Sequence, residues 1–378
     1  MEIQKKKGEP KLTRLVSFSV IVYITAAALV GQPDGENHQV RSTLLKLASA
    51  AATAALALTL GACSTSPSQP TSDRQVPAAD AGQWPRTITD DQGQKVEIPS
   101  KPERIVSTTV STTGTLLAID APVIASSTGA VGPETDKNGF FGQWADVAVE
   151  RKLEPLYQVG NFNLESVLAQ EPDLIIVSTS GADSELDHVD QLKDIAPTMV
   201  VNYGGKDWKG LAAQLGEATG LEAQAKKIAA DFDQRAAQVK EKLNVPEGTT
   251  ASIVSYNKGK DSPVGKTTGP HSRLISALGF TVVDPPAQFD TSTQKREDFA
   301  FTSYEGLSAS AAGDVAFLIS ATEDTAKAFK ADPTLANIAS VQNDNVFPLA
   351  NSFRLDYYSS NDILDYFETQ FPGLNSAK

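Results

Sequence analysis

Cys63 is the single cysteine in a chain of 378 residues, so thiol chemistry has one place to occur. A mostly apolar run of 14 residues, 47–60, leads up to it, and the small residues 61–62 lie directly before it. Arg41 and Lys46 supply positive charge ahead of the run. A basic start, a short apolar core and small residues before the cut are typical of a secretory signal peptide. As a helix, 14 residues would span about 21 Å, which is short for crossing a bilayer.

A cysteine directly after such a cut resembles the lipobox of bacterial lipoproteins, in which the thiol is diacylated and becomes the mature N-terminus. Two or more acyl chains are enough for stable anchoring. We therefore expect residues 40–62 to be a lipoprotein signal peptide. Cys63 would then tether the protein to the extracytoplasmic face of the cell membrane. The competing interpretation is an ordinary cysteine in an N-terminal helix.

Residues 1–39 do not fit this layout. They contain a second apolar run of 16 residues, 15–30, followed by the polar stretch 31–39. A signal peptide needs no second apolar segment, and Val40 could serve as an initiator. We expect residues 1–39 to precede the true start of translation. The alternative is an extra membrane segment, for which 16 residues is short.

The charge of the mature part excludes several partners. Residues 1–62 hold seven Lys or Arg and four Asp or Glu, so 26 basic and 42 acidic residues remain of 33 and 46, a formal charge near −16. Such a charge argues against nucleic acid or an anionic membrane surface as the partner. After residue 62 the only histidines are His188 and His271. We therefore expect no disulfide, no multi-histidine metal site, no direct metal ligation and no resident cofactor.

The pattern after the signal peptide predicts an α/β protein. Residues 63–83 are rich in Ser, Pro, Gln and Ala and lack apolar periodicity, which predicts a disordered tether. From Trp84 onward, short apolar runs alternate with helical stretches, as in an α/β layer with parallel strands. The expected strands are 105–106, 123–125, 174–177, 199–201, 251–256, 281–283 and 315–319. The expected helices are 164–170, 187–195, 271–278, 304–309 and 363–371.

One long amphipathic helix is expected in the middle of this pattern. Its apolar residues recur at steps of three or four, at Ala225, Ile228, Phe232, Ala236, Val239 and Leu243. This spacing describes one face of a helix of roughly 22 residues, about 33 Å long, which Pro246 ends.

The halves on either side of this helix echo each other. Each places a glutamate, Glu165 or Glu305, at an expected helix start shortly before an aspartate that opens an apolar strand. We expect an N-terminal α/β lobe at 84–206, a linking helical segment at 207–246 and a C-terminal α/β lobe with a final helix at 247–378.

Seven stretches carry a resemblance to a known family, at 84–93, 102–126, 140–144, 150–157, 191–203, 214–220 and 353–359. The chain resembles the substrate-binding proteins of ABC importers for ferric siderophores, haem and cobalamin, and within them the binders of ferric enterobactin. The likeness covers nearly all of 84–371. It implies a two-lobed venus-flytrap fold, in which a single helix links the lobes and the ligand lies between them. A stiff helical link implies closure of modest amplitude.

We expect a small set of residues to contact the ligand. Arg354, in the stretch F-R-L-D-Y-Y, follows the apolar run 346–349 in a loop, where binding residues concentrate. Its guanidinium can hydrogen-bond to catecholate oxygens and stack on aromatic rings. The alternative for Arg354 is an ion pair with Asp356 that holds the loop. The other expected contacts are Trp208, Lys295, Arg296, Tyr357 and Lys137.

One stretch departs from the pattern of the enterobactin binders. Those proteins carry arginines where this chain has residues 131–142, with Glu134, Gly142 and the single cation Lys137. The first lobe is therefore less basic than the family pattern, which leaves room for a less anionic siderophore.

The two matching glutamates have two interpretations. The resemblance implies that Glu165 and Glu305, one per lobe, pair with arginines of a permease dimer that an ATPase drives. The alternative is that each carboxylate only stabilises its helix, by about 0.3–1 kcal/mol.

An enzyme is the main rival class. The chain has no G-x-S-x-G, Walker-type, H-E-x-x-H or G-x-G-x-x-G motif. Ser107, Ser178 and Ser180 follow expected strands, but nothing places a histidine beside them. We expect His188 and His271 to be solvated or helix-capping, so an α/β hydrolase is a weak alternative and a purely structural lipoprotein a weaker one.

Within the binding class, the ligand is expected to be a ferric siderophore, with the catecholate type favoured. Haem and cobalamin remain open. Haem would need an axial ligand, for which Tyr256, Tyr304, Tyr357 and Tyr358 are candidates.

Lipid attachment can be tested by metabolic labelling with an alkyne fatty acid. The wild-type protein should be labelled and Cys63→Ser should not, because serine offers no thiol for acylation. Equal labelling of both would refute the prediction.

Overall fold

The computed structural model describes residues 82–375, apart from 180 and 294–295. Cys63 and the expected signal peptide lie outside these residues, as does Lys295. Within the described ranges, none of the helices combines the length and the apolar character that crossing a membrane requires.

The first half of the described chain holds a five-stranded sheet in the order β5-β4-β3-β6-β7, with every neighbouring pair parallel. A short antiparallel hairpin precedes it, β1 (Arg86–Thr89) and β2 (Lys95–Ile98). The sheet strands are β3 (Ile105–Ser107), β4 (Val123–Thr128), β5 (Glu154–Gln158), β6 (Leu174–Ser178) and β7 (Thr198–Val201). The helices are α1 (Val110–Ala118), α2 (Ala145–Glu150), α3 (Leu164–Leu168) and α4 (Val189–Lys193).

The second half holds a six-stranded mixed sheet in the order β11-β9-β8-β12-β13, with β10 paired to β8. Its strands are β8 (Thr250–Val254), β9 (Ser262–Gly265), β10 (Thr281–Val282), β11 (Phe299–Thr302), β12 (Val315–Ile319) and β13 (Val346–Leu349). The helices are α7 (Pro270–Ala277), α8 (Leu307–Ser310), α9 (Glu323–Lys330), α10 (Ala339–Gln342) and α11 (Tyr357–Thr369). Strands β9 and β11 run antiparallel to their neighbours and were not expected from the sequence.

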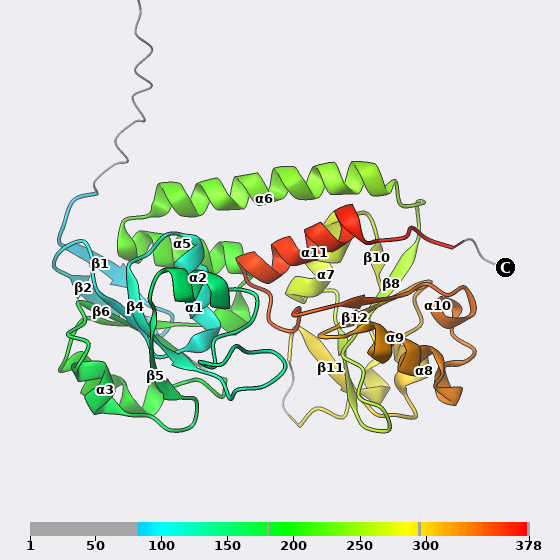
Figure 1. Ribbon diagram of the computed structural model, residues 1–378, viewed down its shortest axis with the longest axis horizontal. Helices are drawn as coiled ribbons and strands as arrows, with labels where there is room; N and C mark the ends of the chain where they lie inside the picture. The colour runs from blue at the N-terminus through cyan, green and yellow to red at the C-terminus, as the bar shows by residue number, and fades with distance from the viewer. Residues whose placement is uncertain (1–81, 180, 294–295, 376–378) are drawn as a thin grey trace, which may run out of the picture. The chain divides into compact units, whose positions relative to one another are not determined.

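Two helices occupy the linking segment, α5 (Trp208–Thr219) and α6 (Glu222–Leu243). The 22-residue α6 buries Ala225, Ile228, Phe232, Ala236 and Val239, which is the apolar face that the spacing predicted. These side chains join a core cluster that contains residues of both sheets. Figure 1 shows α6 running along one side of both sheets, with α3 and α8 on the opposite side.

Two expected helices begin elsewhere. The final helix, expected at 363–371, starts at Tyr357, because Asp356 and Ser359 form a capping box that polar residues, not apolar spacing, supply. The helix expected at 304–309 starts only at Leu307, because Ser303 accepts a hydrogen bond from the Gly306 backbone and holds a turn there.

The start of α11 lies directly against α1 of the first half. Asp356 is buried and accepts hydrogen bonds from the Ser359 backbone at 2.9 Å and from Gln143 Nε2 at 3.2 Å. A Cβ added at Gly114 of α1 would come within 2.6 Å of the Asp356 carboxylate. Glycine is therefore required for this close approach. Burial raises the pKa of Asp356 to about 6, although its hydrogen bonds act to lower it.

Replacing this carboxylate should change how stability depends on pH. Because burial raises the pKa of Asp356 from 3.8 to about 6, the folded state holds the proton more tightly than the unfolded chain. That contribution is full at about pH 4 and below, and it is lost as the pH rises through about 6. Asp356→Asn keeps an oxygen that can cap α11. Because asparagine does not ionise, the variant does not lose this stability as the pH rises. Its free energy of unfolding, relative to wild type, should therefore increase by about 1–3 kcal/mol between pH 4 and pH 7.

Urea unfolding of both proteins at several pH values measures this difference. Asp190→Asn, which changes a fully exposed carboxylate, is the control. A difference between Asp356→Asn and wild type that stays constant over this range would contradict the prediction.

Candidate functional site

A cavity of about 130 Å³ lies between the two halves of the described chain. From the first half it is lined by α1 and the segment 203–211, and from the second half by α7, the segment 296–299 and the loop 353–355. The α1 wall follows β3, the strand from which the chain leads first to β4 on one side and later to β6 on the other. Ligands of open α/β sheets bind at the carboxyl ends of strands at such a switch point.

Arg354 reaches from the second half into the first. Its Nη1 donates a hydrogen bond to Ser111 Oγ at 2.7 Å, and its guanidinium lies 5.3 Å from the centre of the Phe141 ring. The alternative of an ion pair with Asp356 is wrong, because that carboxylate is turned to the α11 backbone and Gln143. Among the described residues, Arg354 forms no ion pair, so its partner at this site is a neutral hydroxyl.

Asp183 holds the start of α1 in place. Its buried carboxylate accepts hydrogen bonds from Thr109 Oγ1 at 2.7 Å, the Ser111 backbone at 2.9 Å and Tyr203 Oη at 2.9 Å. Gly181 makes room for this arrangement, since a Cβ there would lie 1.9 Å from Tyr203 Oη. The position of Ser111, and with it the contact to Arg354, therefore depends on Asp183.

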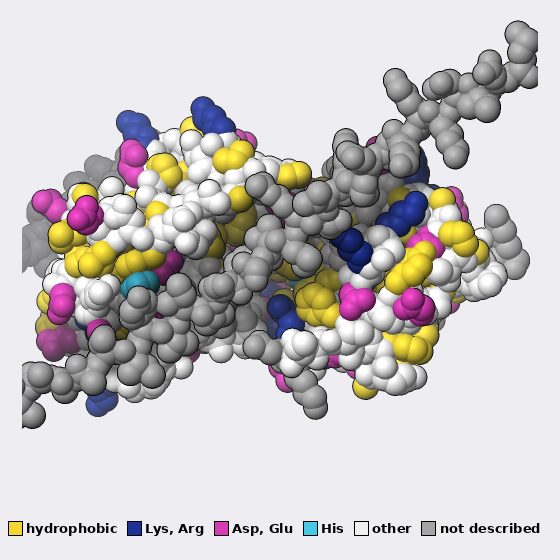
Figure 2. All heavy atoms as spheres, turned by 90° about the horizontal axis from the view of Figure 1, so that it is seen from below, with side chains coloured by type: hydrophobic (Ala, Val, Ile, Leu, Met, Phe, Trp, Pro, Cys, Tyr) yellow, Lys and Arg dark blue, Asp and Glu magenta, His cyan; other side chains and the backbone are white. Residues whose placement is uncertain are grey.

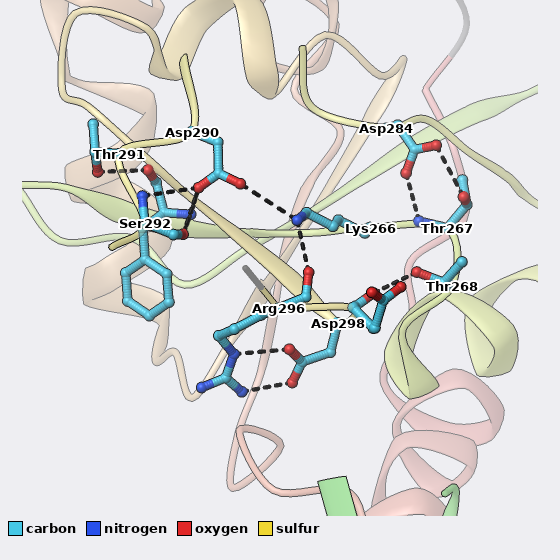
Figure 3. A network of polar contacts seen from close by, with 11 residues as sticks. Lys266, Thr267, Thr268, Asp284, Asp290, Thr291, Ser292, Arg296 and Asp298 are labelled. Atoms are coloured by element: carbon cyan, nitrogen blue, oxygen red, sulfur yellow. Dashed lines mark hydrogen bonds and ion pairs between the residues drawn. The ribbon is translucent and has the colours of Figure 1, made fainter. Parts of the chain in front are cut away.

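Arg296 also lines the cavity, but it is paired. Its Nε and Nη2 donate to the two oxygens of Asp298 at 2.8 and 2.6 Å (Figure 3). Burial by itself would raise the pKa of Asp298, but the hydrogen bonds and charge of Arg296 hold it below its usual value. Lys266 supports this loop from behind, donating to the Arg296 carbonyl at 2.7 Å and pairing with Asp290 at 3.3 Å.

A third cation of the cavity, Lys206, was not expected from the sequence. It pairs with Asp91 at 2.6 Å, and Asp91 also accepts from Gln214 Nε2 at 3.1 Å. Sequence offers no signal for such a pair, because the two residues lie 115 positions apart. On the face shown in Figure 2, basic and acidic side chains are likewise interspersed, and neither sign forms a continuous patch.

The other predicted contacts lie in different environments. Trp208 lines the cavity but is only 6% exposed, and its ring packs edge-on against Phe232 at 5.3 Å and Tyr357 at 5.4 Å. Tyr357 therefore lies behind Trp208 and is not part of the cavity wall. Lys137 is exposed and does not line the cavity either.

His271 lines the cavity, although the sequence did not point to it as a site residue. The expectation that it is solvated or caps a helix is wrong, because it is 4% exposed and its Nε2 lies 2.6 Å from the Ser352 carbonyl. Burial lowers its pKa to about 4, so the ring is neutral at pH 7. With Nε2–H donating to that carbonyl, Nδ1 is an acceptor without a partner among the described residues.

In the part of the chain that the structure describes, which does not include Ser180, neither histidine is hydrogen-bonded to Ser107. His188 is partly buried and stacks on Phe162 with ring centres 4.0 Å apart, so it is not simply solvated. Ser107 Oγ donates to the Thr109 carbonyl at 2.8 Å. The described part of the chain also has no group of three or more His, Cys, Asp or Glu placed to hold a metal ion.

The two glutamates of the predicted docking pair are both exposed. Glu165 lies in the first turn of α3, after the cap Asn163, and Glu305 lies in the turn before α8. Neither carboxylate has a hydrogen bond or an ion pair within the described ranges. Their helices α3 and α8 are on the side opposite α6 (Figure 1).

The periplasmic binding protein family matches residues 105–352, most of both sheets. The chain belongs to this family. It is 42% identical over 302 residues to the ferric enterobactin-binding periplasmic protein FepB of Escherichia coli, covering 78% of this chain and 94% of FepB. It is 32% identical over 162 residues to the iron(3+)-hydroxamate-binding protein YxeB of Bacillus subtilis, covering 42% and 43% of the two chains.

Solved structures agree with this assignment. The crystal structure of holo-ViuP matches with a TM-score of 0.71 at 40% identity, over 77% of this chain and 97% of that one. Staphylococcus aureus SirA complexed with staphyloferrin B shares the fold, with a TM-score of 0.59 at 20% identity, over 75% and 97%. The predicted resemblance and the two-lobed α/β fold with a helical link are thereby confirmed.

Proposed function

We propose that this protein captures a ferric siderophore, with the catecholate type favoured, in the cavity between its lobes and delivers it to an ABC importer. The observation that carries the proposal is Arg354, a cation on the cavity wall whose hydrogen-bond partner is the neutral hydroxyl of Ser111. A ligand oxygen can replace such a partner without leaving a buried carboxylate unpaired. The names of the relatives FepB and YxeB support iron complexes as the ligand class.

Ligand entry requires the lobes to move apart. The cavity of about 130 Å³ is smaller than the roughly 300–1,000 Å³ of typical ligand pockets. Arg354 and Ser111 join the lobes across it, so their contact must open when a bulky complex enters. The single continuous helix α6 limits this to a modest change of angle.

The alternatives have less support. For haem, Tyr256 and Tyr304 both donate to Asp332, at 2.6 and 2.8 Å, and neither lines the cavity. Tyr357 and Tyr358 do not line it either. Cobalamin has no specific observation in its favour. We propose no catalytic activity, and we propose lipid anchoring at Cys63 with delivery at the outer face of the cell membrane.

Removing the Arg354 side chain should weaken ligand binding. A charge-assisted hydrogen bond contributes about 1.5–3 kcal/mol, so Arg354→Ala should raise the dissociation constant roughly 10- to 150-fold. The measurement is quenching of tryptophan fluorescence, since Trp208 lines the cavity, by a panel of ferric catecholates, ferric hydroxamates, haem and cobalamin.

The matched control is Arg151→Ala, which removes an arginine that pairs with Asp120 and does not line the cavity. Unchanged affinity in a folded Arg354→Ala variant would show that this arginine is structural. Binding of haem or cobalamin in preference to every ferric siderophore would overturn the proposed ligand class.

Docking to the permease is a separate prediction. Two exposed carboxylates, one on each lobe, could form matching ion pairs that set the docking register. Glu165→Ala/Glu305→Ala should abolish siderophore uptake by cells and leave ligand affinity unchanged. Glu150→Ala/Glu247→Ala, which removes one exposed glutamate from each half, is the control. Normal uptake, or a parallel loss of affinity, would refute the docking role.

A further inference from the structure

The cations around the cavity differ in whether a carboxylate neutralises them. Lys206 is paired with Asp91, and Arg296 is held by both oxygens of Asp298. Of the three cations on the described cavity wall, Arg354 alone lacks a carboxylate partner.

Among the residues that the structure describes, the charges at the wall therefore almost cancel. Three cations, Lys206, Arg296 and Arg354, face two carboxylates, Asp207 and Asp298, and Asp91 behind Lys206 brings the sum to zero. A charge taken out of water must be compensated by its surroundings. A trianionic ferric tris-catecholate would leave most of its charge uncompensated here, whereas a neutral or weakly anionic complex would not.

Asp298 is the carboxylate of this set that binds a cavity cation through both of its oxygens. Asp207 caps α5 by accepting from the Gly210 backbone at 2.9 Å, and Asp91 is bound by Gln214 as well as by Lys206. In contrast, both oxygens of Asp298 are turned to the Arg296 guanidinium (Figure 3). The Arg296 side chain is 48% exposed. A ligand can therefore reach it when Asp298 no longer neutralises its charge.

We propose that Asp298 is a specificity-determining residue that sets the ligand charge which the cavity accepts. By neutralising Arg296, it favours ferric siderophores of low net charge, including catecholate complexes with fewer than three negative charges, over the trianionic ferric tris-catecholates. This inference rests on the proposed function and adds to it the charge class of the ligand.

The test compares two ligands of similar size and different charge, a trianionic ferric tris-catecholate and a neutral ferric tris-hydroxamate. Asp298→Asn keeps the shape and removes one negative charge. Its affinity for the trianion should rise about tenfold or more, because one like charge beside the ligand is gone, while affinity for the neutral complex should change less than about twofold. Asp284→Asn is the control, since Asp284 belongs to the same loop region but binds Thr267 and not Arg296.

A second variant tests the same idea with the opposite sign. Arg296→Gln leaves the charge of Asp298 uncompensated, so it should weaken binding of the trianion more than binding of the neutral complex. Circular dichroism and thermal unfolding verify that each variant is folded.

Four results would overturn the inference. An equal change for both ligands in Asp298→Asn and in Arg296→Gln, or no change for the trianion in either, would show that Asp298 does not select by charge. Wild-type protein that binds the trianion more tightly than all less anionic complexes would do the same, with the proposed function intact. Wild-type protein that binds no ferric siderophore would overturn the proposed function and this inference together.

Discussion

The close approach of Asp356 to Gly114 is the contact on which the cavity depends. The buried carboxylate caps α11 in the second half and lies against α1 in the first, where any side chain larger than hydrogen would collide with it. Arg354 is two residues before this cap. The position of the cap therefore determines that the guanidinium of Arg354 meets Ser111 and Phe141 instead of extending into solvent. Burial of an ionisable group, with its raised pKa, is the energetic cost of this arrangement.

Helix α6 supplies the other constraint. Because one continuous apolar face packs into a core shared by both sheets, the two lobes cannot separate without losing buried contacts along a 22-residue helix. Relative motion is therefore expected as a small change of angle. Such a link suits a site in which a few contacts, including that of Arg354 with Ser111, exchange protein partners for ligand atoms.

The charge balance close to the cavity differs from the net charge of the whole chain. Residues 63–378 carry a formal charge near −16, which repels anions at long range. At short range, two of the three cations on the described part of the wall, Lys206 and Arg296, are paired with carboxylates, so this part of the cavity is close to neutral and not strongly positive. Asp298 illustrates this balance. Its bidentate pair with Arg296 orders the loop before β11, and it also neutralises the positive charge that Arg296 would otherwise present to a ligand. We therefore expect local pairing, more than net charge, to decide which ligand is favoured.

Sequence patterns predicted the α/β class and the central helix, but several strands were not expected, namely β1, β2, β5, β9, β11 and β13. Apolar periodicity determines which faces are buried, so the central helix and the parallel strands such as β12 could be predicted from local spacing. The antiparallel strands β9 and β11 could not be predicted, because they are short and do not follow the alternation of strands and helices that indicates parallel strands. The first residue of α11 was not predicted either, because a capping box of polar residues defines it and apolar spacing does not.

The site was decided by tertiary structure. The motif F-R-L-D-Y-Y pointed to Arg354, but its partner is 243 positions away, and Asp356, its neighbour in sequence, turns out to belong to the helix cap. The buried state of His271 and the pairing of Lys206 with Asp91 likewise depend on chain segments that meet only after folding. Sequence determines which residues carry charge, whereas the fold decides which charges are neutralised, because ion pairing falls off within a few ångströms and depends on geometry that local spacing does not encode.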